Sequence, residues 1–171
     1  KITIFIIDSV NSFSIFSCMK FKIGIIGKGF VGNAVASGFS QDHGIDSSIK
    51  IYDVNPELST HSLDETVNDS DFIFLSVPTP AFEDGSIDLT IVDNALKSIE
   101  EVINVDNIVL IRSTVVPGTS AFFQKKFQQL NIVFNPEFLT ERNAVKDFIN
   151  QDRIILGGDE RNVAKVANLY N

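Results

Sequence analysis

The residues whose types and spacing best fit chemistry begin with a glycine-rich turn, Gly27-Lys-Gly29-Phe-Val-Gly32, which is answered about 20 residues later by Asp53. Gly27 would permit a tight turn, Gly29 would let a pyrophosphate approach the backbone, and Gly32 would let a helix pack closely on a strand. The N-terminal amides of that helix would face the phosphates. Asp53 would accept hydrogen bonds from the ribose hydroxyls and would repel the 2′-phosphate of NADP. Either feature alone fits an ordinary turn, but together they favour a site for NAD.

Two glutamates form a second candidate site. Glu137 and Glu141 are four residues apart and follow an expected strand at residues 132–134. In one helical turn, side chains at this spacing point the same way, and open α/β sheets bind ligands at the carboxyl ends of their strands. A carboxylate in a partly dry pocket can take a proton from water during a hydrolysis. The alternative is that these acids merely complement a helix dipole.

The elements that must position these residues follow from the alternation of short apolar runs and amphipathic stretches, which is typical of βαβ units. The expected strands are 21–26, 49–52, 71–77, 107–111, 132–134 and 152–156, and the expected helices are 30–39, 89–102, one opening at Pro117-Gly118 and one from Asp159. The predicted fold class is therefore α/β, a doubly wound parallel sheet of the Rossmann type.

Composition limits the partners of the 171 residues. The net charge of −8 argues against binding to nucleic acid, because an acidic chain is repelled by phosphate backbones. The single cysteine, Cys18, excludes an intrachain disulfide. Neither histidine, His43 or His61, has neighbours at metal-ligand spacing, so no metal site is expected. Fifteen phenylalanines and no tryptophan place most of the bulky packing on phenylalanine.

The first 18 residues are expected to precede the domain. Residues 1–7 are apolar, but Asp8 and Asn11 interrupt the stretch well short of the about 20 residues that span a bilayer. A signal peptide with a lipoprotein-like Cys18 competes with a simpler interpretation, that Met19 is the true start. We expect an upstream or non-native extension at 1–18 and an NAD-binding domain at 19–171, located in the cytoplasm without a membrane partner.

Further motifs resemble one family, the UDP-glucose and GDP-mannose dehydrogenases. The matching segments, in chain order, are Lys22-Ile-Gly-Ile-Ile-Gly-Lys-Gly-Phe-Val-Gly32, Ser76-Val-Pro-Thr-Pro80, Asp84-Gly-Ser-Ile-Asp-Leu89, Arg112-Ser-Thr-Val-Val-Pro-Gly-Thr119, Asn135-Pro-Glu-Phe-Leu-Thr-Glu141 and Asp152-Arg-Ile-Ile-Leu-Gly157. The resemblance implies two successive NAD-dependent hydride transfers that oxidise a sugar C6 alcohol to a carboxylate, through a thiohemiacetal and a thioester on a cysteine. The implied substrate is a nucleotide-sugar, UDP-glucose first.

The resemblance also implies roles for individual residues. Thr114 would lie near the nicotinamide and the catalytic water, Glu137 would assist thioester hydrolysis through a water, and Glu141 would approach the nicotinamide. The backbone of Phe138 and Leu139, together with both glutamates, would contact the nucleotide-sugar. The residues implied to hold NAD are Gly27, Gly29, Phe30, Val31, Gly32, Asp53, Val77, Pro78, Thr79, Thr114 and Glu141.

The sequence departs from the family in two ways. Arg142 stands where the family commonly has glycine, so that position is strained if it needs a positive φ and harmless if it is helical. The family's connecting helix and its C-terminal substrate domain, with the nucleophilic cysteine, have no counterpart in the sequence. Nucleophilic catalysis needs its nucleophile, so this chain is expected to bind NAD without completing the reaction and to be part of a longer protein that forms a homodimer.

Three alternatives stay open. The longer protein could oxidise GDP-mannose or a UDP-N-acetylhexosamine instead of UDP-glucose. A β-hydroxyacid dehydrogenase has a similar N-terminal fold but does not need the segment from Asn135 to Glu141. The chain could also be a stand-alone NAD-binding module without catalysis.

Overall fold

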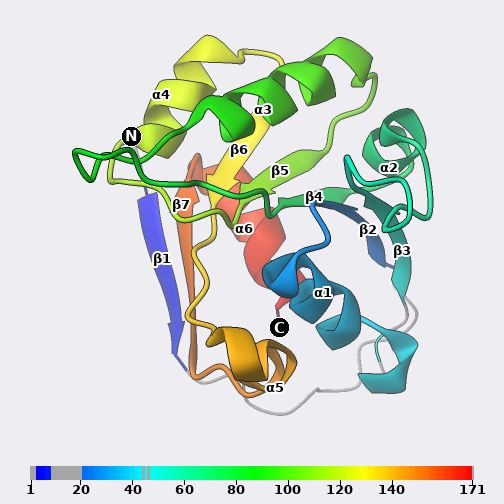
Figure 1. Cartoon of the computed structure of the whole chain (residues 1–171). Helices are drawn as coiled ribbons and strands as arrows, with labels where there is room; N and C mark the ends of the chain where they lie inside the picture. The colour runs from blue at the N-terminus through cyan, green and yellow to red at the C-terminus, as the bar shows by residue number, and fades with distance from the viewer. Residues whose placement is uncertain (1–2, 9–20, 44, 46, 171) are drawn as a thin grey trace.

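A twisted sheet with helices on both faces forms the framework of the chain (Figure 1). The computed structural model describes residues 3–8, 21–43, 45 and 47–170. The strands are β1 (Thr3–Asp8), β2 (Phe21–Ile26), β3 (Ser47–Tyr52), β4 (Phe72–Leu75), β5 (Ile108–Ile111), β6 (Asn131–Phe134) and β7 (Arg153–Gly158). The helices are α1 (Phe30–Gly38), α2 (Leu63–Asn68), α3 (Thr90–Val102), α4 (Thr119–Lys126), α5 (Ala144–Ile149) and α6 (Glu160–Leu169), with 3-10 turns η1 (Gln41–His43) and η2 (Glu141–Asn143).

The order of the strands in the sheet is β1-β7-β6-β5-β4-β2-β3. The strands β3, β2, β4, β5 and β6 are parallel, which confirms the doubly wound α/β fold of the Rossmann type. One edge of the sheet adds antiparallel strands to this parallel core, because β7 is antiparallel to β6 and β1 is antiparallel to β7. Two parallel strands need a crossover connection that brings the chain back to the end of the sheet where the first strand began. Between β6 and β7 the chain instead turns back through η2 and α5.

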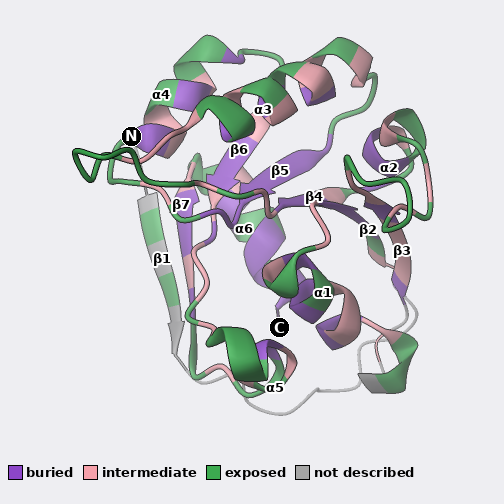
Figure 2. Ribbon diagram, viewed as in Figure 1, coloured by how far each residue is buried: buried purple, intermediate pink, exposed green. Residues whose placement is uncertain are grey.

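Strands that are buried on both faces give the sheet two cores (Figure 2). One core lies between the sheet and α1, α5 and α6, and the other lies between the sheet and α2, α3 and α4. Successive residues of β4 face opposite cores, so that Phe74 enters the first while Ile73 and Leu75 enter the second. This explains why the central strands are continuous apolar runs rather than alternating ones. Phe39 packs against Phe74 and Phe148 with ring centroids 5.6 Å apart, as the phenylalanine-rich composition suggests.

Two α-helices and one strand were not predicted from the sequence. Helices α2 and α5 have only six residues each, too few for a clear apolar period. The strand, β1, pairs with β7 along its whole length at the edge of the sheet. Residues 9–20, which include Cys18 and Met19, lie outside the described residues. The assignment of residues 1–18 to an extension therefore stays a prediction.

Candidate cofactor and active site

Hydrogen bonds join the carboxyl ends of the parallel strands, where the predicted site residues lie. The backbone amide at the end of one strand donates to a carbonyl of its neighbour, in the pairs Gly27 to Tyr52 (3.0 Å), Ser76 to Ile26 (2.8 Å), Arg112 to Leu75 (2.9 Å) and Asn135 to Ile111 (3.0 Å). The Ser113 hydroxyl also donates to the Val77 carbonyl at 2.7 Å. The segments after β2, β4, β5 and β6 are thereby fixed relative to one another.

The glycine-rich turn has the conformation that its sequence predicts. Gly27 has φ of 92°, and a Cβ there would lie 2.6 Å from the Ser76 carbonyl oxygen. A Cβ on Gly32 would lie 2.0 Å from the Gly27 carbonyl oxygen, so only glycine lets α1 start this close to β2. Both expectations are confirmed. A Cβ on Gly29 would meet nothing within 4 Å, because it would point into open space.

Helix α1 offers a place for a phosphate group next to that open space. Its N-cap is Gly29, which provides no side-chain hydrogen bond, and its first turn holds no acidic residue. The first amides of a helix have no partner within the helix and carry partial positive charge. This combination of free donors and an open approach at Gly29 fits the pyrophosphate of a dinucleotide.

Asp53 is held directly beside the glycine-rich turn. Its Oδ2 accepts a hydrogen bond from the Lys28 amide at 2.7 Å, and its Oδ1 accepts one from the Asn55 amide at 2.9 Å. A carboxylate has about four lone-pair sites, so each oxygen keeps acceptor capacity for a ribose hydroxyl. The half-buried position at the end of β3 therefore fits the role predicted for Asp53.

A cavity of about 720 Å³ brings most of the predicted residues together. Its size is within the range of small-molecule and cofactor sites. The predicted residues that line it are Gly27, Gly29, Phe30, Val31, Asp53, Val77, Pro78, Thr79, Thr114 and Glu137. Asp53 follows β3 and Glu137 follows β6, so the cavity extends along the carboxyl edge of the parallel strands. Gly32, Phe138, Leu139 and Glu141 are outside its lining.

Several lining residues were missed by the sequence analysis. One group flanks Asp53 and comprises Tyr52, Val54, Leu58 and Leu63. Another is a stripe on α3, formed by Ile91, Asn94, Ala95 and Ser98. The stripe repeats at three and four residues and is offset from the buried stripe of Val92, Leu96 and Ile99. This second helical period was the signal that could have identified it.

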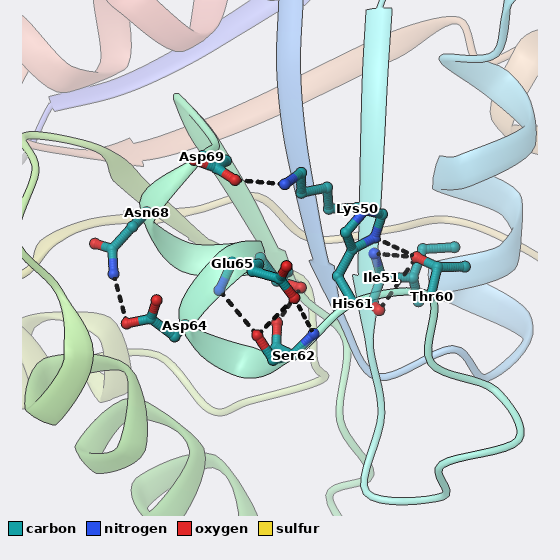
Figure 3. A network of polar contacts seen from close by, with 10 residues as sticks. Lys50, Ile51, Thr60, His61, Ser62, Asp64, Glu65, Asn68 and Asp69 are labelled. Carbon is teal, nitrogen blue, oxygen red and sulfur yellow. Dashed lines mark hydrogen bonds and ion pairs between the residues drawn. The ribbon is translucent and has the colours of Figure 1, made fainter.

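The loop between β3 and α2, which includes Val54 and Leu58, is held against β3 by polar contacts (Figure 3). The Thr60 hydroxyl accepts a hydrogen bond from the Ile51 amide at 3.0 Å, and the Thr60 amide donates to the Ile51 carbonyl at 2.9 Å. Ser62 and Glu65 form a capping box that starts α2. Lys50 of β3 forms an ion pair with Asp69 at the end of α2. The loop between β3 and α2 is thus anchored at both ends.

The two glutamates do not share a helical turn, so that prediction is wrong. Residues 135–140 have no helical structure, and Glu141 is the first residue of η2. Pro136 favours an extended conformation for the residue before it. The Thr140 amide and hydroxyl both donate to the Asp147 carboxylate, at 2.8 and 2.6 Å, which closes the turn after the extended segment. Glu137 consequently lines the main cavity, whereas Glu141 lines a second hollow between α1 and α5.

Comparison with known proteins places this geometry in a family. Residues 46–171 match the model of the UDP-glucose/GDP-mannose dehydrogenase family, NAD binding domain. The chain belongs to this family. The UDP-glucose 6-dehydrogenase AglM of Haloferax volcanii is 30% identical over 80% of the chain and 40% of its own length. The UDP-glucose 6-dehydrogenase of Rickettsia prowazekii is 42% identical over 51% of the chain and 21% of its own length.

Solved structures of dehydrogenases have the same fold. A UDP-glucose dehydrogenase from Pyrobaculum islandicum superposes with a TM-score of 0.79 at 28% identity, over 93% of the chain and 46% of that structure. A GDP-mannose dehydrogenase from Pseudomonas aeruginosa superposes with a TM-score of 0.68 at 22% identity, over 86% of the chain and 43% of that structure. The chain therefore spans less than half the length of these relatives. It is an NAD-binding domain of a family of nucleotide-sugar dehydrogenases.

Three positions between β6 and β7 bear on the resemblance to the dehydrogenase family. Arg142 stands where the resemblance leads us to expect glycine, and it lies within η2, whose backbone conformation any L-residue adopts. Phe138 is 55% exposed, and the Arg153 guanidinium lies 5.4 Å from its ring centroid. Leu139 packs against the core between the sheet and α1, α5 and α6.

Within residues 3–8, 21–43, 45 and 47–170, no cluster of histidine, cysteine, aspartate or glutamate could hold a metal ion. In the same part of the chain, no helix is both long and apolar enough to cross a membrane.

Proposed function

We propose that this chain is the NAD-binding part of a dehydrogenase that oxidises the C6 hydroxyl of UDP-glucose to a carboxylate. One observation carries the proposal. A single cavity joins the glycine-rich turn and Asp53, which suit a dinucleotide, to Thr114 and Glu137, which suit the chemistry of an alcohol oxidation. The family membership supports the reaction class, and the UDP-glucose dehydrogenases among the relatives support the substrate.

The residues of the cavity divide the work between binding and proton transfer. The first amides of α1 would hold the pyrophosphate, Asp53 would accept hydrogen bonds from the ribose, and Val77, Pro78 and Thr79 would line the path beyond β4. Hydride acceptance is the chemistry that NAD supplies when it is bound. Thr114 would orient a water, and the Glu137 carboxylate would take a proton from that water as it attacks an acyl intermediate.

The second hollow has a place in the same proposal. Phe30 lines both the main cavity and the hollow that contains Glu141, so the two spaces are adjacent. Glu141 would approach the nicotinamide side of the site from there, and the backbone of Phe138 and Leu139 would contact the nucleotide-sugar. The cysteine nucleophile, the rest of the substrate pocket and the surface for a homodimer would belong to the remainder of a longer protein. Its cytoplasmic location stays a prediction.

Calorimetric titration of this chain with NAD⁺ and with NADP⁺ tests the cofactor assignment. We expect binding of NAD⁺ with a dissociation constant at least about 10-fold below that of NADP⁺, because Asp53 would repel the 2′-phosphate. Equal affinity for both dinucleotides, or no binding of either, would refute it. A coding frame that continues beyond the Asn171 codon and encodes a cysteine-bearing domain would support the longer enzyme, and an immediate stop would favour a binding module.

Activity of such a longer protein tests the substrate. UDP-glucose, GDP-mannose and a UDP-N-acetylhexosamine are compared as substrates by the rate at which NADH forms, and we expect UDP-glucose to have the highest kcat/KM. Glu137→Gln should lower the overall oxidation by at least about 100-fold, since general base catalysis contributes about 10²- to 10⁴-fold. Unchanged oxidation in this variant would count against the role of Glu137 and would favour a β-hydroxyacid dehydrogenase.

A further inference from the structure

The segment that carries Glu137 begins with a residue whose hydrogen bonds reach three other elements. Asn135 is 1% exposed, and its backbone amide donates to Ile111 at the end of β5 at 3.0 Å. Its Nδ2 donates to the Ile155 carbonyl of β7 at 3.1 Å. Its Oδ1 accepts hydrogen bonds from Arg112 Nη1 and from the Tyr170 hydroxyl, both at 2.7 Å. Asn135, at the end of β6, is thus connected to β5, to β7 and to the end of α6.

Arg112 is unusual because, among the described residues, its buried charged side chain has no carboxylate as an ion-pair partner. The side chain is 1% exposed, and no acidic residue in the described part of the chain forms an ion pair with it. Its guanidinium carbon lies 5.4 Å from the centroid of the Phe148 ring, while Nε and Nη2 have no hydrogen-bond partner among the described residues. A buried charge is weak evidence for stability, since an apolar residue of similar volume is often as stable. We therefore expect Arg112 to serve by fixing the orientation of its hydrogen-bond acceptor rather than by adding stability.

Arg112 and Tyr170 both donate a hydrogen bond to the same acceptor, Asn135 Oδ1. A hydrogen bond from a charged donor is shorter and stronger than one between neutral groups. Burial raises the pKa of Tyr170 to about 12, so its hydroxyl stays protonated and remains a donor at ordinary pH. Two donors converging on Asn135 Oδ1 leave its side chain a single orientation. The next residue, Pro136, has a fixed φ and no amide proton, so the orientation of Asn135 is passed on to Glu137.

We propose that Arg112 and Tyr170 are positioning residues that act through Asn135 to fix the orientation of residues 137–139, and thereby of Glu137, in the cavity. The proposal rests on the proposed function, which gives Glu137 its role. Arg112 lines the cavity and Tyr170 does not, and the positioning role requires neither residue to bind the cofactor or the substrate. Arg112 also directly precedes Ser113 and Thr114, so the same strand end fixes both sides of the cavity around Glu137.

The test uses two mild variants and a matched control. Tyr170→Phe removes one donor to Asn135 and keeps the ring, whereas Arg112→Lys keeps the charge but loses the planar donor group. The control is Tyr52→Phe, because the chain has two tyrosines and Tyr52 lies at the other end of the cavity, beside Asp53. The readouts are ¹⁵N relaxation of residues 137–139, the signals of the Asn135 side-chain amide, the melting temperature, and the NAD⁺ dissociation constant.

We expect the backbone order parameters of residues 137–139 to fall from about 0.85 towards 0.6 in Tyr170→Phe and in Arg112→Lys, and to stay unchanged in Tyr52→Phe. The NAD⁺ dissociation constant of Tyr170→Phe should stay within about twofold of the original, because the glycine-rich turn and Asp53 are remote from it. If Arg112→Lys does not fold, Tyr170→Phe alone carries the test.

A lower melting temperature with unchanged order at residues 137–139 would assign both residues to packing alone and would overturn the proposal. The proposed function fails separately. If the original chain does not bind NAD⁺ but residues 137–139 still lose order in both variants, the cofactor assignment is refuted and the positioning relationship stands.

Discussion

The Asp53 carboxylate accepts a hydrogen bond from the backbone amide of Lys28 at 2.7 Å, so the acidic residue after β3 is fixed to the glycine-rich turn after β2. Two motifs that lie far apart in the sequence are joined by the protein itself. A second hydrogen bond, from the Asn55 amide, holds the other carboxylate oxygen. Asp53 therefore shapes the turn, and under the proposed function it would also bind the ribose.

The first prediction separates the role of Asp53 in the turn from its proposed role in ribose binding by removing its charge. Asp53→Asn keeps one oxygen acceptor but loses the ionised group, and a hydrogen bond to a charged group is worth about 1.5–3 kcal/mol. We expect the NAD⁺ dissociation constant to rise by at least about 10-fold and the preference over NADP⁺ to narrow. Calorimetric titration measures both constants. Asp84→Asn is the matched control, because Asp84 also accepts a backbone amide in a turn but lies outside the cavity. Unchanged affinities in Asp53→Asn would contradict the assignment.

The second prediction concerns the open space at Gly29. A methyl group there meets no protein atom within 4 Å and the backbone has φ of −70°, so Gly29→Ala should fold normally. It should nevertheless weaken NAD⁺ binding by at least about 10-fold, because the pyrophosphate must approach this backbone. Thermal unfolding and calorimetry are measured together. Gly157→Ala is the control, since a Cβ there makes only ordinary contact with Phe134 at 3.8 Å. Tight NAD⁺ binding by Gly29→Ala would place the pyrophosphate elsewhere.

Much of the fold was predictable because the parallel strands are short apolar runs and because α1 and α3, which follow β2 and β4, are long enough to show a helical period. The direction of β7 was not, since an apolar run such as Ile154-Ile-Leu156 reads the same in either direction. Helix α2 was missed although Ser62 and Glu65 have the spacing of a capping box, which is a sequence signal for a helix start. Its six residues are too few for periodicity to be informative.

Some features of the candidate site were likewise predictable from the sequence and others were not. Gly27, Gly32 and Asp53 were found because local spacing alone dictates their geometry. The predicted orientation of Glu141 was wrong because the four-residue spacing from Glu137 was interpreted as a helical turn. The local backbone is instead determined by Pro136 and by the hydrogen bond from the Thr140 amide to the Asp147 carboxylate. The contacts among Arg112, Asn135 and Tyr170 were not predictable, since they exist only once β5, β6 and α6 have packed together.

The third prediction is a dependence of stability on pH at α2. Hydrogen bonds from the Ser62 backbone and then from its side chain lower the pKa of Glu65 below 4.5. A carboxyl whose pKa is lower in the folded state stabilises above its unfolded pKa, and this contribution is lost as pH falls through the folded value. Melting temperature should therefore fall as the pH is lowered from about 5 to about 3.

Two variants isolate the contribution of the capping box to this acid sensitivity. Ser62→Ala should melt lower near neutral pH, because loss of an N-cap costs about 1 kcal/mol, and it should lose less on acidification. Glu65→Gln has no carboxyl to titrate and is the control for a flatter profile. The melting temperatures of the original protein and of both variants are measured by circular dichroism as a function of pH. An identical pH dependence of the melting temperature in all three would show that the capping box makes no measurable contribution to the acid sensitivity.

The fourth prediction tests whether β1 belongs to the folded domain. Removing residues 1–8 would leave β7 with an unpaired edge along all six of its residues. Each lost hydrogen bond costs about 1 kcal/mol, and an exposed edge can pair with another chain. We expect a lower melting temperature, faster hydrogen exchange of the β7 amides, and self-association that increases with concentration.

A matched control for this truncation changes only the exposed side chains of β1. Ile4 and Ile6 are 69% and 55% exposed, so the double variant Ile4→Thr/Ile6→Thr keeps the strand and should unfold at nearly the original temperature. Hydrogen exchange of β7 is compared among the three proteins. If the truncated chain keeps both its melting temperature and the protection of β7, then β1 contributes nothing to the fold. Residues 1–8 would then be part of an extension outside the domain, as the sequence predicts for residues 1–18.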